Sequence, residues 1–208
     1  MAKAYDYLTM LNGLIRTPVT VVITPLAKAL LRVGIAPAVV TSVGTGAAVV
    51  ASVALFPTGH FFAASLIVGV FALSDLLDGT MARLSGSASN WGAFLDSNLD
   101  RVTDAAIFGS LAAYYSGRNQ LLFVLSLISM AGGFFVSYAK ARAESLGFEC
   151  SGGLMERAER LIIILLAVGL SGLGVPYVAG IGLWVLAVGS LFTFGQRLRQ
   201  VSIASQNA

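Results

Sequence analysis

Residues 75–100 read DLLDGTMARLSGSASNWGAFLDSNLD, and this stretch decides how the rest of the chain is interpreted. It carries four aspartates, Asp75, Asp78, Asp96 and Asp100, and long apolar segments lie on both sides of it. A carboxylate in the hydrocarbon of a membrane costs at least ~2.5–3.5 kcal/mol, so four of them need compensating partners or a function. The stretch therefore predicts a helical hairpin that carries a functional acidic site.

The rest of the chain has the composition of an integral membrane protein. Of its 208 residues, 57% are hydrophobic and only 11% are charged. A soluble domain carries about 25% charged residues, which excludes an ordinary soluble enzyme and a disordered chain. Cys150 is the only cysteine, so an intramolecular disulfide and a zinc–cysteine cluster are excluded. The net charge of +3 is better explained by membrane topology than by binding of nucleic acid.

We expect one all-α membrane domain over residues 1–208, with an N-terminal amphipathic interfacial helix within about residues 1–34 and six spans within about residues 38–204. The segment over residues 17–32 is interrupted by Pro18 and Pro25 and ends in Lys28 and Arg32, which favours a helix lying in the interface over a short first span. The six predicted spans are 38–56, 60–84, 92–115, 121–143, 160–173 with its flanks, and 177–194.

Basic residues predict how these spans are oriented. Arg118 alone falls on one side of the predicted bundle, and Arg101 falls within a span. Because basic loops stay in the cytoplasm, we expect a multi-pass protein of the cell membrane with both termini and the acidic site on the cytoplasmic side. The basic residues on that side are Lys3, Arg16, Lys28, Arg32, Arg83, Lys140, Arg142, Arg157, Arg160, Arg197 and Arg199.

The spacing of the aspartates predicts a metal site. Asp75 and Asp78 are three residues apart and Asp96 and Asp100 four, so each pair lies on one helix face, and an antiparallel hairpin brings the pairs to matching depths. Four converging carboxylates repel one another, and Mg²⁺, Mn²⁺ or Ca²⁺ would suit such oxygen ligands. Two alternatives are buried salt bridges and a cation pathway through the bilayer. We assign Asp104 to pairing with Arg101 or to hydrogen bonding.

Residues 75–100 also form the pattern D-x2-D-G-x2-A-R-x8-G-x3-D-x3-D. This pattern resembles the signature of the CDP-alcohol phosphotransferase family at all eight positions and at the family's spacing. The resemblance implies a metal-assisted transfer of a CMP-linked phosphoalcohol to an acceptor hydroxyl, with CMP as the leaving group. It also implies Mg²⁺, as two ions, or Mn²⁺ as the cofactor, with no role for nucleic acid.

The resemblance assigns roles to individual residues. Asp75, Asp78, Asp96 and Asp100 are the implied metal ligands, and Asp100 is also the implied general base. The family usually has Pro-Asn or Pro-Asp before its Val-Thr pair, whereas Ala38 stands at that position here, so a side-chain contact from it is not expected. The implied contacts with the donor are Ala38, Val39, Val40, Thr41, Gly79, Arg83 and Ser89.

A second group of basic residues suggests a phosphorylated acceptor. Arg157 and Arg160 are three residues apart and can reach one point together. Two interpretations stay open, because such residues serve either as topology signals that contact anionic lipid or as a phosphate pocket. The candidates for a pocket are Ser137, Lys140, Arg142, Arg157, Arg160 and Arg197.

Two strings around these residues point to a particular acceptor. FFVSYAKARAES (residues 134–145) and MERAERLIII (residues 155–164) resemble segments of the actinobacterial phosphatidylinositol phosphate synthases. This resemblance implies CDP-diacylglycerol and an inositol monophosphate as substrates, phosphatidylinositol phosphate and CMP as products, and a homodimer in the lipid membrane. The alternatives are a phosphatidylglycerophosphate synthase that uses glycerol 3-phosphate and, from another class, a cation transporter or channel.

Overall fold

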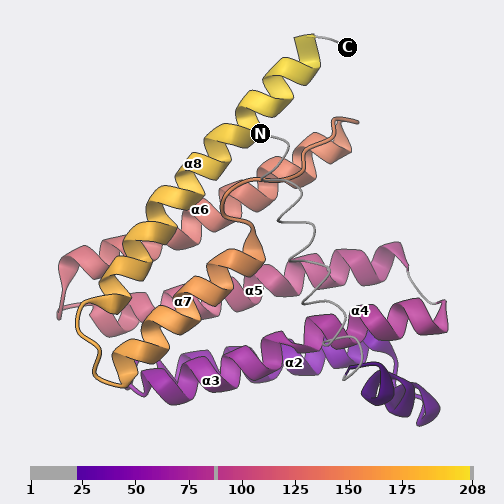
Figure 1. Cartoon of the computed structure of the whole chain (residues 1–208), viewed down its shortest axis with the longest axis horizontal. Coiled ribbons are helices and arrows are strands. Elements are labelled where there is room, and N and C mark those ends of the chain that lie inside the picture. The colour runs from indigo at the N-terminus through magenta and orange to yellow at the C-terminus, as the bar shows by residue number, and fades with distance from the viewer. Residues whose placement is uncertain (1–22, 87–88, 207–208) are drawn as a thin grey trace, which may run out of the picture. The chain divides into compact units, whose positions relative to one another are not determined.

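The structure, a computed structural model, describes residues 23–86 and 89–206 of the chain. Within these residues it consists of helices and connections without a strand, which confirms the all-α expectation (Figure 1). Residues 23–32 form the first described helix. It is followed by α2 (Pro37–Leu55), α3 (Phe61–Ala72), α4 (Ser74–Ser85), α5 (Asn90–Tyr115), α6 (Gln120–Ser145), α7 (Arg157–Gly172) and α8 (Val178–Gln206).

Proline and glycine punctuate these helices. Pro37 is the first residue of α2, a position where its missing N–H costs nothing. Gly86 ends α4 in the left-handed region (φ +64°), and its N–H caps the carbonyl of Ala82. Gly117 turns the chain after α5 at φ +72°. Most of these helices begin and end within a few residues of the predicted boundaries, but α8 continues to Gln206, well beyond the predicted end of the last span at residue 194.

The predicted N-terminal interfacial helix falls partly outside the described residues, which begin at residue 23. The described part, residues 23–32, is helical and contains Pro25. Its Ala27 side chain is fully buried. The placement of this helix in a membrane interface stays a prediction.

Four of the helical segments have the length and composition of membrane spans: Pro37–Leu55, Phe61–Ser85 (α3 with α4), Gln120–Ser145 and Val178–Gln206. The prediction of six spans is thus only partly supported. α5 has the length but carries Asp96, Asp100, Arg101 and Asp104, which lower its hydropathy. α7 has 16 residues, about 24 Å of helix against a hydrocarbon core of about 30 Å.

The chain divides into two compact units. The described part of the first comprises residues 23–46, 71–86 and 89–99, and it holds the start of α2, α4 and the start of α5. α2 and α4 touch at Gly44, where a Cβ atom would overlap the hydroxyl of Ser74. Thr41 on α2 also donates a hydrogen bond to the Asp78 carboxylate on α4. These contacts fix the two helices that carry most of the donor candidates.

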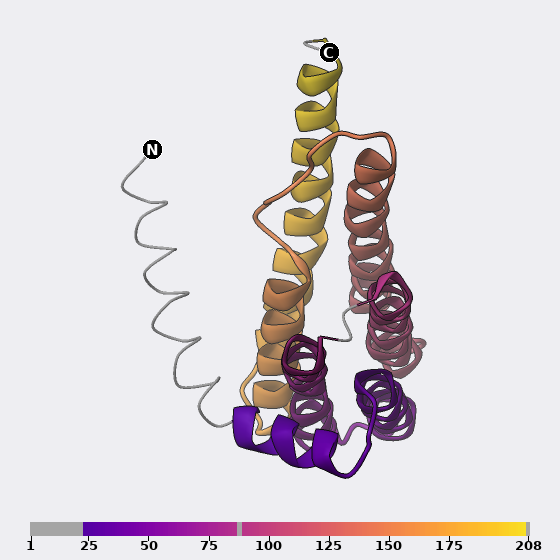
Figure 2. The same cartoon turned by 90° about the vertical axis from the view of Figure 1, so that its right-hand side faces the viewer.

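The second unit comprises residues 47–70 and 100–206 of the described chain, and α8 packs against α6 and α7 within it. Small residues allow the close approach: a Cβ atom on Gly132 of α6 would lie 2.9 Å from the Cβ atom of Ser190 on α8. Ser129 of α6 donates a hydrogen bond to the Leu183 carbonyl of α8 at 3.3 Å. Figure 2 shows the connection that follows α6 running alongside α8.

Candidate active site

The first unit brings three of the predicted metal ligands together. Asp75 and Asp78 lie one turn apart on α4, and Asp96 lies near the start of α5. One carboxylate oxygen from each of the three residues lies within 4.8 Å of the other two. Asp78 is buried at 8% exposure, and the other two are half-buried. Among the described residues, this is the arrangement that could hold a metal ion.

The chemistry of this group fits a divalent hard cation. All three ligands are carboxylates, which suit Mg²⁺, Mn²⁺ or Ca²⁺ and disfavour metals that prefer sulfur. Three carboxylates at such short separations repel one another unless a cation neutralises them. The hydroxyl of Thr41 binds one oxygen of Asp78 and leaves the other for a metal. Orientation of a ligand by a neighbouring hydrogen bond is usual at metal sites.

A cavity of about 390 Å³ opens beside these carboxylates in the same unit. Asp78 and Asp96 line it, as do four of the seven predicted donor contacts, Ala38, Thr41, Gly79 and Ser89. A Cβ atom at Gly79 would meet only Arg83 within 4 Å, so the missing side chain leaves room in the cavity. The cavity is also lined by residues that we had not predicted as contacts: Ala36, Pro37, Ala82, Trp91 and Ala93.

The other three donor candidates lie outside the cavity lining. Val39 is half-exposed, Val40 is partly buried, and Arg83 donates a hydrogen bond to the Thr80 hydroxyl at 3.0 Å. Trp91 is the most prominent wall residue that we had not predicted. It stacks on Phe94 with the ring centroids 5.8 Å apart, and its only signal in the sequence is its place beside Gly92 of the motif.

Asp100 lies in the second unit and is bound by arginine side chains. Its Oδ1 atom lies 2.7 Å from Arg157 Nη1, and its Oδ2 atom lies 3.3 Å from Arg101 Nη1. The same Arg101 donates a hydrogen bond to the Ser137 hydroxyl at 2.7 Å. The implied base and two of the acceptor candidates, Ser137 and Arg157, are therefore connected through ion pairs and a hydrogen bond.

Asp104 is hydrogen-bonded, which was one of the two roles expected for it. Its carboxylate accepts a hydrogen bond from Arg160 Nη2 at 3.1 Å and lies 3.8 Å from Arg157 Nε. We had not predicted that these partners on α7 would bind it. Arg157 lies between two carboxylates one turn apart on α5, Asp100 and Asp104.

The six acceptor candidates divide into two groups by exposure. Lys140 and Arg142 are accessible at the end of α6, where they contact Glu144 and Ser145, and Arg157 and Ser137 are partly exposed. Arg160 and Arg197, by contrast, are buried at 2% and 3% exposure. Their side chains bind protein acceptors, and the expected contact of Arg160 and Arg197 with a phosphate stays a prediction.

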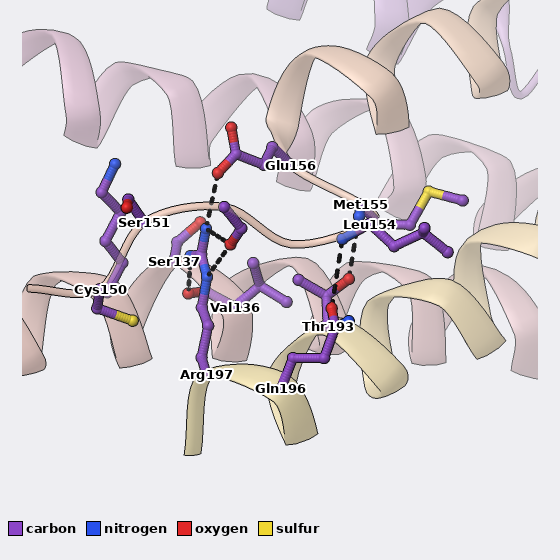
Figure 3. A network of polar contacts seen from close by, with 12 residues as sticks. Val136, Ser137, Cys150, Ser151, Leu154, Met155, Glu156, Thr193, Gln196 and Arg197 are labelled. Atoms are coloured by element: carbon purple, nitrogen blue, oxygen red, sulfur yellow. Dashed lines mark hydrogen bonds and ion pairs between the residues drawn. The ribbon is translucent and has the colours of Figure 1, made fainter. Parts of the chain in front are cut away.

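The partners of these two arginines are main-chain carbonyls and carboxylates. Arg160 binds Asp104 and the Met155 carbonyl at 3.3 Å. Arg197 donates to the Val136 carbonyl at 2.6 Å and to the Gly152 carbonyl at 3.4 Å, and it pairs with Glu156 at 3.2 Å (Figure 3). Both side chains thus hold the connection between α6 and α7.

Comparison with known proteins gives consistent matches. A family model described as CDP-alcohol phosphatidyltransferase matches residues 6–195. The phosphatidylinositol phosphate synthase of Streptomyces avermitilis is 45% identical over 208 residues, covering 96% of this chain and 85% of that protein. The crystal structure of Mycobacterium tuberculosis phosphatidylinositol phosphate synthase with CDP-DAG bound is 43% identical, with a TM-score of 0.83 over 86% of this chain and 92% of that one. The same enzyme in complex with manganese and citrate gives the same identity and TM-score over 86% and 88%.

Proposed function

The chain belongs to the CDP-alcohol phosphatidyltransferase family, and on that basis we propose that it is a phosphatidylinositol phosphate synthase. It transfers the phosphatidyl group of CDP-diacylglycerol to an inositol monophosphate and releases CMP. The observation that carries this proposal is the group of Asp75, Asp78 and Asp96 at the wall of a cavity lined by the motif residues Gly79 and Gly92. The names of relatives at 42–49% identity support the choice of acceptor.

In the proposed site, Asp75, Asp78 and Asp96 would hold Mg²⁺, or Mn²⁺ as a substitute, and Asp100 is a further proposed ligand. When bound, these ions neutralise the pyrophosphate of the donor and make CMP a better leaving group. A related enzyme was crystallised with manganese, which supports the choice of a divalent ion. The geometry of the three carboxylates supports one ion directly, and the second rests on the family resemblance.

The donor lies in the cavity beside the carboxylates. Its small wall residues, Ala38, Gly79 and Ala82, allow the nucleotide to approach the main chain closely, and the hydroxyls of Thr41 and Ser89 offer hydrogen bonds. Trp91 adds an aromatic wall. Val39, Val40 and Arg83 remain proposed contacts at the edges of this site. The structure of a relative with CDP-DAG bound supports this donor.

Asp100 is the proposed general base. It takes the proton from the acceptor hydroxyl, whose oxygen then forms a bond to the phosphorus that carries diacylglycerol, while the bond from that phosphorus to CMP breaks. Asp100 follows Asp96 by one helical turn on α5, which supports a place at the deep end of the motif.

The acceptor phosphate binds near Arg157. Ser137, Lys140 and Arg142 are the further candidates for direct contact, because each retains exposed surface. The phosphate of the acceptor distinguishes inositol phosphate from free inositol, for which such a cluster would serve no purpose. Glycerol 3-phosphate carries a phosphate as well, and it is the alternative acceptor within the family.

The proposed setting is the cell membrane. Six spans, with both termini and the site facing the cytoplasm, agree with the distribution of basic residues in the sequence. α5 and α7 would complete the six if neighbouring helices covered their polar groups. The proposed homodimer rests on the family resemblance alone.

The experiment that tests this function measures release of CMP from CDP-diacylglycerol by the protein in liposomes with Mg²⁺. Inositol phosphate, glycerol 3-phosphate and free inositol are offered separately, and we expect release with inositol phosphate alone. Asp100→Asn should fold and bind the donor without releasing CMP, and an active variant would refute its role as the base. Flux of cations through the liposomes, with no CMP from any acceptor, would instead support a transporter.

A further inference from the structure

The connection between α6 and α7 leads directly into Arg157 and is held by α8. This connection, residues 146–156, is called the α6–α7 loop below. Its last part runs beside α8, and main-chain atoms of the loop form hydrogen bonds with side chains of α8 (Figure 3). The position of the main chain immediately before Arg157 is therefore set by residues of another helix.

Four α8 side chains make these bonds. Thr193 accepts the Met155 N–H at 3.0 Å, and Gln196 accepts the Leu154 N–H at 3.4 Å. Arg197 donates to the Gly152 carbonyl at 3.4 Å, and Gln200 donates to the Ser151 carbonyl at 3.4 Å. Residues three, four and seven positions apart share one face of a helix, so a single stripe of α8 pairs with four of the five loop residues 151–155.

Tight packing holds the loop against the same stripe. Met155 is buried at 8% exposure, and a Cβ atom on Gly189 would lie 2.6 Å from its Cγ atom. A Cβ atom on Gly153 would lie 2.5 Å from Thr193 Cγ2, and Gly153 has a φ of +140° that favours glycine. The loop thus fits into space that small residues on both sides leave open.

Two buried arginines bind the end of the loop. Arg160 of α7 binds the Met155 carbonyl and is itself paired with Asp104 of α5, while Arg197 of α8 binds Glu156 as well as Gly152. The loop over residues 152–156 is therefore bonded to α7 and α8, and Arg157 follows it directly.

We propose that this bonding makes Thr193 and Gln196 positioning residues, which fix the start of α7 so that Arg157 is placed in advance for the phosphate of the acceptor. The inference rests on the proposed function and adds to it two residues that determine acceptor binding without touching the acceptor. Arg197 holds the same loop through Gly152 and Glu156.

The physical reason is the conformational freedom of an arginine side chain. Immobilising such a side chain on binding costs about 0.5–1.5 kcal/mol, and a moving backbone adds to this cost. Arg157 already pairs with Asp100 and Asp104. A fixed main chain further limits the conformations of the Arg157 side chain, so less freedom is lost when it binds a phosphate. Loosening the loop should therefore weaken acceptor binding while leaving donor binding intact, because the donor candidates lie on other segments.

Thr193→Val tests this proposal, because it keeps the shape of a fully buried side chain and removes the oxygen that accepts the Met155 N–H. We expect the KM for inositol phosphate to rise about two- to tenfold, which corresponds to the loss of one hydrogen bond. The KM for CDP-diacylglycerol should be unchanged. Thr193→Ser, which restores the acceptor oxygen, should return the KM toward the wild-type value. Gln196→Met, at a partly exposed position, provides an independent variant with the same expected direction.

Ser129→Ala is the matched control. It removes another buried hydrogen bond between α6 and α8, the one from Ser129 to the Leu183 carbonyl, and leaves the loop untouched. Three results would overturn the positioning role. The first is an equal rise in the KM for inositol phosphate in the control, and the second is an equal change in the KM for both substrates. The third is an unchanged KM for inositol phosphate in both Thr193→Val and Gln196→Met. If the wild-type protein releases no CMP with inositol phosphate, the proposed function itself is refuted. This result differs from those that would overturn only the positioning role.

Discussion

Replacing Asp104 by asparagine should strongly destabilise the protein, because Asp104 neutralises a buried arginine. Arg160 is exposed by only 2%, and its Nη2 atom lies 3.1 Å from the Asp104 carboxylate. Asparagine preserves the shape of the side chain and removes the charge. The guanidinium of Arg160 would then stay buried with a neutral amide and the Met155 carbonyl as its partners.

The expected loss is about 3–5 kcal/mol, the usual cost of removing one member of a buried ion pair. In a chain of this length, that corresponds to a fall in Tm of roughly 6–20 °C. The double variant Asp104→Leu with Arg160→Met should recover most of this loss, because an apolar pair of similar volume leaves no uncompensated charge in the interior.

The assay is thermal unfolding of the purified protein in one detergent, with Glu144→Gln as the control. Glu144 pairs with Lys140 at 3.9 Å on the surface, with side-chain exposures of 55% and 45%, so its loss should cost about 0.5 kcal/mol or less. If Asp104→Asn and Glu144→Gln lower Tm equally, or if the double variant is no better than Asp104→Asn, the account of this pair is wrong.

Three further predictions concern the first unit. Asp78→Asn should raise the Mg²⁺ concentration for half-maximal CMP release by more than tenfold, since loss of even an outer partner of a metal ligand costs about 10–100-fold; a metal titration of activity checks this. Gly44→Ala should destabilise the protein by about 1–3 kcal/mol, because the added Cβ atom would overlap Ser74. Gly46→Ala, whose Cβ atom would have nothing within 4 Å, should stabilise the protein by about 0.4–1 kcal/mol, and thermal unfolding of both variants measures the difference. Trp91→Ala should raise the KM for CDP-diacylglycerol without changing that for inositol phosphate, and steady-state kinetics should show no such change for Trp184→Ala, which lies outside the cavity lining.

Much of the helical structure was predictable from the sequence because proline and glycine mark its boundaries. α2 and α6 lie within two residues of their predicted ends, and the stretch from α3 to α4 matches a predicted span. The break between Ala72 and Ser74 was not predicted, because neither proline nor glycine marks it in the sequence. The polar content of α5 and the short length of α7 explain why the span count could not be established in the same way.

The metal site was predictable for a similar reason. Helical spacing places Asp75 beside Asp78, and the short connection brings α5 back toward them with Asp96. The partners of Asp100 and Asp104 on α7, Arg157 and Arg160, lie more than fifty residues away in the chain, and spacing within one helix carries no information about them. The burial of Arg160 and Arg197 escaped prediction as well, because arginines at the end of a span usually mark topology.

The pairing of α8 with the α6–α7 loop depends on the phase of the helix. A single residue inserted between Thr193 and Gln196 would rotate everything beyond it by about 100° and turn Gln196, Arg197 and Gln200 away from the loop together. Insertions and deletions should therefore be excluded from these two turns in active homologues, while the exposed end of α8 beyond Gln200 should accept them. An alignment of active sequences would reveal this as a gap-free block on a helix that otherwise varies in length.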